Sequence, residues 1–136
     1  HSVLTGVEVD PALAPSMIDE FPALFVAAAL AEGTTMTSGL DELRVKESDR
    51  IAVMARGLKW LGIDARETPD GIIIKGGRLQ GGEIESHGDH RIAMSFAMAG
   101  LVAAGSIKVH DCKNVDTSFP GFVGLAAQAG LSVRVI

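Results

Sequence analysis

The apolar residues of this 136-residue chain form segments that predict helices buried to different degrees. Residues 22–31 and 91–104 are apolar on nearly every face, so both are predicted to be helices buried on all sides. Gly33 and Gly105 are expected to end these two helices. Residues 51–61 carry apolar side chains at helical spacing, which predicts an amphipathic helix with one face in the core. No uninterrupted apolar run reaches the length of a membrane span.

Short stretches of strand-forming residues lie between these helices. The segment Pro69-Asp70-Gly71 is typical of a hairpin turn, and residues 63–67 and 71–75 on either side are predicted to be its strands. Residues 10–15 are expected to be a loop, and residues 122–129 a last helix. The remaining predicted strands are residues 4–9, 34–37, 79–85, 106–109 and 131–136.

The two halves of the chain repeat one pattern. Residues 19–33 contain a lead-in loop, a buried helix and a final glycine, and residues 91–105 have the same length and pattern. A strand, a polar loop, a second helix ending in glycine and another strand follow each copy. We therefore predict an α/β (α+β) fold in which residues 1–136 form a single domain. The two buried helices should pack on each other inside, with sheet outside.

Composition and charge narrow the classes of function. Apolar residues make up 47% of the chain, which is enough for a real core. The net charge is −5 and no broad basic stripe is present, which argues against a nucleic-acid partner. Cys112 is the only cysteine and the histidines are scattered, so no disulfide framework and no metal site are expected. A reducing, cytoplasmic location fits this cysteine usage.

Charged residues are concentrated at positions 44–50, Arg-Val-Lys-Glu-Ser-Asp-Arg, directly before the amphipathic helix. Ser48 is predicted to cap that helix, which would hold the preceding charges in a fixed place. Lys46 and Arg50 are candidates for holding an anion, and Glu47 between them is a candidate for carrying a proton. The alternative interpretation is a solvated charged turn that only caps a helix.

A second polar group, Asp89-His90-Arg91, heads the second buried helix. Arg91 opens a helix with few other polar residues, so its guanidinium should stay at the rim, where a helix N-terminus favours anions. His90 is either a local hydrogen-bonding residue or part of the same site. Asp19 lies at the matching point of the other copy, where it either complements the helix dipole or joins Glu47 as a second carboxylate. We expect the helix heads to face a common anionic ligand.

Four motifs together are similar to those of one enzyme family. The order and spacing of these motifs closely resemble those of the 5-enolpyruvylshikimate-3-phosphate synthases, in particular the bacterial class II-like enzymes that tolerate the herbicide glyphosate. The resemblance covers the whole chain. The four motifs are Met17-Ile18-Asp19-Glu20-Phe21-Pro22, residues 44–50, Asp89-His90-Arg91-Ile92-Ala93-Met94 and Thr117-Ser118-Phe119-Pro120.

The resemblance implies an activity, a fold and partners. The activity is transfer of the enolpyruvyl group of phosphoenolpyruvate to the 5-hydroxyl of shikimate-3-phosphate, with release of phosphate, in cytoplasmic aromatic amino acid biosynthesis and without a cofactor or metal. The family has two similar domains, each built from three βαβαββ units with buried parallel helices and outer sheets. This chain would be most of the C-terminal domain, with the N-terminal domain as partner in a monomeric enzyme. It should bind neither nucleic acid nor a membrane.

By similarity to the family, individual residues acquire roles in the reaction. Asp19 matches the carboxylate that accepts the proton of the 5-hydroxyl group. Glu47 matches the proposed proton donor to the methylene carbon, and Lys46 matches a contact with shikimate-3-phosphate. The chain alone would supply half of the active site and lack turnover.

The resemblance also assigns residues to phosphoenolpyruvate. Arg50 and Arg91 match residues that grip this substrate, and His90 lies beside them. The chain departs from some family members at Thr117, where they carry Lys, and at Glu42, where they carry Asn, so no firm ligand contact follows at either position. Two alternatives stay open: a related enzyme that transfers enolpyruvyl to UDP-N-acetylglucosamine, and a non-catalytic anion-binding module of the same fold.

Overall fold

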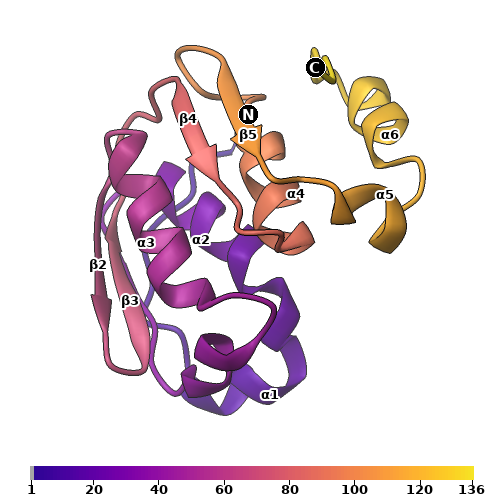
Figure 1. Ribbon diagram of the computed structural model, residues 1–136. Coiled ribbons are helices and arrows are strands. Elements are labelled where there is room, and N and C mark those ends of the chain that lie inside the picture. The colour runs from indigo at the N-terminus through magenta and orange to yellow at the C-terminus, as the bar shows by residue number, and fades with distance from the viewer. Residues whose placement is uncertain (1) are drawn as a thin grey trace.

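The computed structural model of the chain describes residues 2–136, so His1 lies outside the described residues. Three helices pack against one another on the inside, with a three-stranded sheet and a two-stranded sheet beside them (Figure 1). The three inner helices are α2 (Phe21–Leu30), α3 (Arg50–Trp60) and α4 (His90–Ala99). The strands are β1 (Thr34–Met36), β2 (Asp64–Thr68), β3 (Gly71–Lys75), β4 (Gly82–Glu85) and β5 (Ile107–His110).

The larger sheet has the strand order β1-β3-β2, and both of its pairings are antiparallel. Asp64 pairs with Lys75 at one end of the β2–β3 hairpin and Thr68 pairs with Gly71 at the other, which confirms the predicted turn. The smaller sheet pairs β4 with β5 in parallel, and α4 connects the two strands. The α/β class expected from the sequence is confirmed.

Helix α2 is a core helix, but it is not buried on all sides as predicted, because Ala23 is exposed and lines a cavity. Phe25 and Ala29 have no exposed surface, and Phe21 is 1% exposed. The helix ends before Gly33, whose φ of +87° is strained for any residue with a Cβ atom. α2 packs against both α3 and α4, so the two buried helices do lie against each other.

The segment before α2 is more helical than the sequence suggested. In place of the predicted loop, residues Pro11–Leu13, Ala14–Met17 (α1) and Ile18–Glu20 form short helical segments that run into α2. The succession Pro11–Leu30 is long and apolar enough, by length and composition alone, to cross a membrane. Asp19 and Glu20 interrupt this stretch, so it is not the kind of uninterrupted apolar run that the sequence excluded. It is weak evidence for a span, because a buried core helix passes the same test and α2 is such a helix.

Helix α4 is shorter than predicted and begins earlier. It starts at His90 and ends at Ala99. The chain leaves the helical path after Gly100, because the Ala104 N–H donates to the Leu79 carbonyl, outside the helix, at 2.8 Å. α4 lies close to α3 at Gly57: a Cβ atom placed there would be 2.5 Å from Cζ of Phe96. The absence of a side chain at this position therefore lets the Phe96 ring fit between the helices.

The predicted repeat is present in the order of the elements, but the two copies differ in how completely their parallel strands form. In the first copy, Thr5 and Glu8 form single parallel bridges with Glu32 and Met36, so residues 4–9 are not the continuous strand that was predicted. In the second copy the equivalent parallel pair, β4 and β5, is complete. In both copies a buried helix joins the two parallel segments.

The last part of the chain contains α5 (Asn114–Ser118) and α6 (Phe122–Gln128), which lie to one side of the inner helices (Figure 1). α6 confirms the predicted last helix, whereas α5 was not predicted. Residues 131–136 do not form the predicted strand. In the first copy the corresponding strand, β2, pairs only with β3, and the described residues contain no counterpart of β3 after α6.

Candidate active site

The charged loop before α3 is fixed by a helix cap, although the capping residue differs from the prediction. Asp49, not Ser48, caps α3: its Oδ1 accepts a hydrogen bond from the Ala52 N–H at 3.0 Å. Arg50 is the first helical residue, so position 49 is the one whose side chain reaches the free N–H groups of the first turn. Ser48 instead points toward α4, where its hydroxyl donates to Oδ2 of Asp89 at 2.8 Å.

Arg50 lies at the centre of the candidate site and its side chain is 1% exposed. Its Nε donates to Oδ2 of Asp89 at 2.8 Å, and its Nη2 lies 3.3 Å from Oδ1 of the same carboxylate. Its Nη1 donates to Oδ1 of Asp19 at 3.1 Å, and Nη2 also donates to Oε2 of Glu47 at 2.6 Å. Burial alone would lower the pKa of Arg50, but the hydrogen bond and charge of Asp89 outweigh it and raise the pKa.

Asp89 connects Arg50 to the start of α4. It is fully buried and caps α4 by accepting hydrogen bonds from the backbone N–H groups of Arg91 and Ile92 at 3.1 Å and 3.4 Å. Burial on its own would raise the pKa of Asp89. The hydrogen bonds from Arg50 and Ser48 and the charge of Arg50 outweigh burial and lower the pKa, so Asp89 is ionised at neutral pH.

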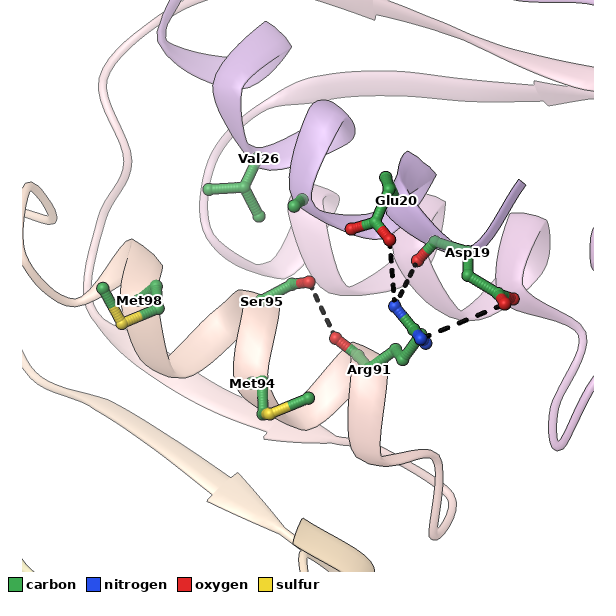
Figure 2. A pocket seen from close by; sticks show the side chains of 8 residues that line it. Asp19, Glu20, Val26, Arg91, Met94, Ser95 and Met98 are labelled. Carbon is green, nitrogen blue, oxygen red and sulfur yellow. Dashed lines mark hydrogen bonds and ion pairs between the residues drawn. The ribbon is translucent and has the colours of Figure 1, made fainter. Parts of the chain in front are cut away.

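Arg91 reaches from α4 to the residues just before α2 (Figure 2). Its Nη1 donates to the backbone carbonyl of Asp19 at 3.1 Å and to Oε1 of Glu20 at 3.4 Å, and its Nη2 lies 3.9 Å from Oδ2 of Asp19. These groups form the polar end of a cavity of about 210 Å³, whose apolar wall includes Val26 and Met94. Arg91 therefore stays at the rim of the apolar helix, as its position in the sequence predicted.

Asp19 receives positive charge from several directions. Lys46 lies 3.7 Å from its Oδ1, and Lys46 also donates to Oε1 of Glu42 at 3.0 Å. Burial alone would raise the pKa of Asp19, but the hydrogen bond from Arg50 and the charges of Arg91, Lys46 and Arg50 lower it. A carboxylate with a lowered pKa is ionised at neutral pH and has a free lone pair with which to accept a proton.

The structure thus brings together five of the six residues singled out from the sequence: Asp19, Lys46, Glu47, Arg50 and Arg91. The sixth, His90, lies at the side of this group, where it lines a second hollow of about 550 Å³ between α4 and α6. Within residues 2–136 its side chain makes none of the hydrogen bonds of the cluster. The heads of α3 and α4 lie side by side, joined through Asp89. That they hold a common anionic ligand stays a prediction.

Two residues of the cluster were missed as participants in the site. Asp89 was identified only as part of a polar group, and its role as partner of Arg50 has no signal in the sequence, because the two residues lie on different helices. Its capping role had a signal, since an aspartate directly before an apolar helix is a typical N-cap. Glu20 was likewise passed over, although it neighbours Asp19 at the approach to α2.

The chemistry of the cluster suits anions and proton transfer. Lys46, Arg50 and Arg91 supply positive charge, while Asp19 and Glu47 are partly exposed carboxylates bound to adjacent nitrogens of one guanidinium. A pair of carboxylates beside cations is able to accept one proton and donate another while an anionic ligand is held. Among residues 2–136, no three His, Cys, Asp or Glu side chains are grouped so as to hold a metal ion.

Comparison with known proteins identifies the family. The model of the family described as EPSP synthase (3-phosphoshikimate 1-carboxyvinyltransferase) matches residues 2–125. A protein of that name from Nitrosococcus oceani is 65% identical over 133 residues, which cover 98% of this chain and 30% of that protein. One from Acidithiobacillus ferrooxidans is 59% identical over 135 residues, covering 99% of this chain and 31% of that protein.

Solved structures agree with the sequence comparison. An EPSP synthase structure from Acinetobacter baumannii superimposes with a TM-score of 0.94 and 56% identity, covering 97% of this chain and 32% of that chain. A second structure of EPSP synthase from the same organism gives a TM-score of 0.92 and 53% identity. The chain spans about a third of the length of these relatives. With a family model that matches most of its residues, this chain belongs to the EPSP synthase family.

Proposed function

We propose that this chain is most of the C-terminal domain of a two-domain 3-phosphoshikimate 1-carboxyvinyltransferase. The whole enzyme transfers the enolpyruvyl group of phosphoenolpyruvate to the 5-hydroxyl of shikimate-3-phosphate and releases phosphate. The observation that carries this proposal is the pair of carboxylates, Asp19 and Glu47, on adjacent nitrogens of the buried Arg50 guanidinium. Membership of the family and the length of its relatives support the same assignment.

In the proposed reaction the two carboxylates move protons in opposite directions. Asp19 accepts the proton of the 5-hydroxyl as that oxygen attacks carbon 2 of phosphoenolpyruvate, and Glu47 donates a proton to the methylene carbon, which becomes a methyl group. The resulting tetrahedral intermediate then returns a proton from its methyl group to Glu47 and expels phosphate, which takes up the proton held by Asp19, and the enolpyruvyl ether forms. Asp19 is suited to the first role because it is ionised at neutral pH and partly exposed, so that a substrate hydroxyl can reach its carboxylate.

Positive side chains hold the two anionic substrates in this proposal. Lys46 contacts shikimate-3-phosphate, and Arg50 and Arg91 grip phosphoenolpyruvate, with His90 beside them. Both substrates carry a phosphate and a carboxylate, so each needs several converging cations. Since this chain supplies only part of the charges, closure of the N-terminal domain over it would complete the site and exclude water. The full-length protein is expected to be a cytoplasmic monomer.

Glu47→Gln in the full-length protein tests the catalytic assignment. Glutamine has the size of glutamate and its carbonyl oxygen still accepts the hydrogen bond from Arg50, but its amide protons are not acidic enough to be given to carbon. Turnover should fall by about a hundredfold or more, while phosphoenolpyruvate and shikimate-3-phosphate still bind. Unchanged turnover would remove Glu47 from the mechanism, and loss of substrate binding would make it a binding residue instead.

The 136-residue chain alone tests the half-site assignment. Incubated with both substrates, it should release no phosphate above background, because the cations of the other domain are missing. The full-length protein under the same conditions is the control. Phosphate release by the isolated chain at the rate of the full-length protein would show that the site is complete without a second domain.

A further inference from the structure

The three carboxylates that hold Arg50 differ sharply in their access to water. The side chains of Asp19 and Glu47 are 44% and 52% exposed, whereas that of Asp89 has no exposed surface. Arg50 itself is 1% exposed, so a ligand reaches its guanidinium only where a carboxylate moves aside. Asp19 and Glu47 border solvent, so water can solvate their carboxylates once they leave Arg50, whereas Asp89 is enclosed by protein.

The contacts of Asp89 also divide the guanidinium of Arg50 into two sides. Asp89 takes Nε at 2.8 Å and lies 3.3 Å from Nη2, which together form one edge of the planar group. Nη1 is left to Asp19, and the remaining N–H of Nη2 is left to Glu47. Because an arginine fork held along one edge has a fixed plane, the outer nitrogens keep one direction when their partners change.

The same carboxylate sets the position of the second cation. Oδ1 of Asp89 caps α4, the helix whose second residue is Arg91. Oδ2 of Asp89 accepts a hydrogen bond from the hydroxyl of Ser48, the neighbour of Glu47. A displacement of Asp89 would therefore move Arg50 and the head of α4 together. Among residues 2–136, the side chain of Asp89 is the one that hydrogen-bonds both to Arg50 and to the backbone N–H groups at the start of α4.

We propose that Asp89 is a positioning residue for the phosphoenolpyruvate side of the site. It holds the inner edge of Arg50 permanently, so that the outer nitrogens exchange Asp19 or Glu47 for an anionic group of the substrate without losing their alignment. This inference rests on the proposed function for the identity of the substrate. Asp89 touches no reacting atom and acts only through Arg50 and Arg91.

Asp89→Asn in the full-length protein separates positioning from folding. Asparagine keeps an oxygen that can cap α4. Its NH₂ group would face Nε of Arg50, and because both groups are donors, the hydrogen bond between residues 89 and 50 would be lost there. The KM for phosphoenolpyruvate is expected to rise by about 10- to 100-fold, while the KM for shikimate-3-phosphate stays within about twofold. A residue with a purely structural role would lower kcat with the folded fraction and leave both KM values unchanged.

Asp49→Asn is a matched control. Asp49 is also an N-cap aspartate, with Oδ1 on a backbone N–H and Oδ2 on an arginine, Arg44, at 2.9 Å. This pair lies outside the cluster, so the control should leave both KM values within about twofold. An equal change in the two variants, or a parallel rise of both KM values in Asp89→Asn, would overturn the inference. If Asp89→Asn does not fold, Asp89→Glu keeps the charge but shifts the guanidinium, and the same selective rise in KM is expected.

Measuring the binding of inorganic phosphate tests the role of Asp89 without depending on enolpyruvyl transfer, which tests the proposed function. Absence of enolpyruvyl transfer by the unmodified full-length protein would refute the proposed function alone. Calorimetry with inorganic phosphate then decides the role of Asp89. A Kd weakened at least tenfold in Asp89→Asn but not in Asp49→Asn would support the inference, and equal Kd values in all three proteins would overturn it.

Discussion

Replacing Gly57 by alanine is expected to destabilise the chain, although alanine is ordinarily favoured over glycine inside a helix. Gly57 lies within α3 and faces Phe96 of α4. A Cβ atom at position 57 would lie 2.5, 2.9 and 3.3 Å from three carbons of the Phe96 ring. Contacts below 3 Å are repulsive, and Phe96 has no exposed surface toward which it could move.

The magnitude follows from two opposing contributions. Alanine in a helix interior is about 1 kcal/mol more favourable than glycine, because glycine loses more backbone freedom on folding. An extra methyl group in a packed core costs about 1–3 kcal/mol, and a contact with a rigid, fully buried ring belongs at the upper end of that range. The free energy of unfolding of Gly57→Ala should therefore be about 1–2 kcal/mol lower than that of the original chain.

Gly124→Ala is the control within the same chain. Gly124 lies inside α6 with a helical φ, and no atom lies within 4 Å of the position that its Cβ would take. Only the helix preference acts there, so this variant should gain about 0.5–1 kcal/mol. Guanidinium unfolding of the 136-residue chain, followed by far-UV circular dichroism, gives both free energies from the midpoints and slopes.

The result that would refute this reasoning is a midpoint for Gly57→Ala that rises as much as that of Gly124→Ala. A second check uses the double variant Gly57→Ala with Phe96→Leu. The smaller leucine removes the ring atoms that the new methyl group would meet, so the double variant should be more stable than the sum of the two single changes predicts. Strict additivity would show that Gly57 and Phe96 do not determine each other's fit.

Two further outcomes are expected from the charges of the site. Asp89 and Asp19 have lowered pKa values, so their contribution to stability is complete above the unfolded pKa of about 3.9 and is lost as the pH falls through their folded values. The denaturant midpoint of the chain should fall below about pH 4, and an equally steep fall in Asp89→Asn would contradict this explanation for Asp89. Glu20→Gln removes a carboxylate 3.4 Å from Nη1 of Arg91, so in the full-length protein the KM for phosphoenolpyruvate should decrease by about two- to fivefold. An unchanged or higher KM would show that Glu20 does not compete with the anion.

Local sequence signals predicted the elements whose causes are local. The apolar spacing of residues 51–61 located α3, and Pro69-Asp70-Gly71 located the hairpin, because each depends on a few neighbouring residues. The shortened α4 depended on a backbone partner far along the chain, the Leu79 carbonyl, and residues 131–136 form no strand because the described residues offer them no partner strand. Such partners do not appear in a local pattern.

The same distinction applies to the candidate site. Arg50 and Arg91 were predictable because each opens an apolar helix, and a charged side chain there must stay near the rim or find a partner. Arg50 found partners and is fully buried, which its spacing in the sequence did not show. The capping residue of α3 was misplaced by one position, because Ser48 and Asp49 are both good caps and only the start of the helix decides between them.

The link from Asp89 to Arg50 has a consequence for how the chain folds. One buried carboxylate belongs to the second copy of the repeat and satisfies a buried cation of the first. If either copy opened alone, it would leave an uncompensated charge in the interior of the other, which is among the most costly defects in a protein. The two copies should therefore unfold as one cooperative unit, with the amide hydrogens of α3 and α4 exchanging with solvent at the same free energy.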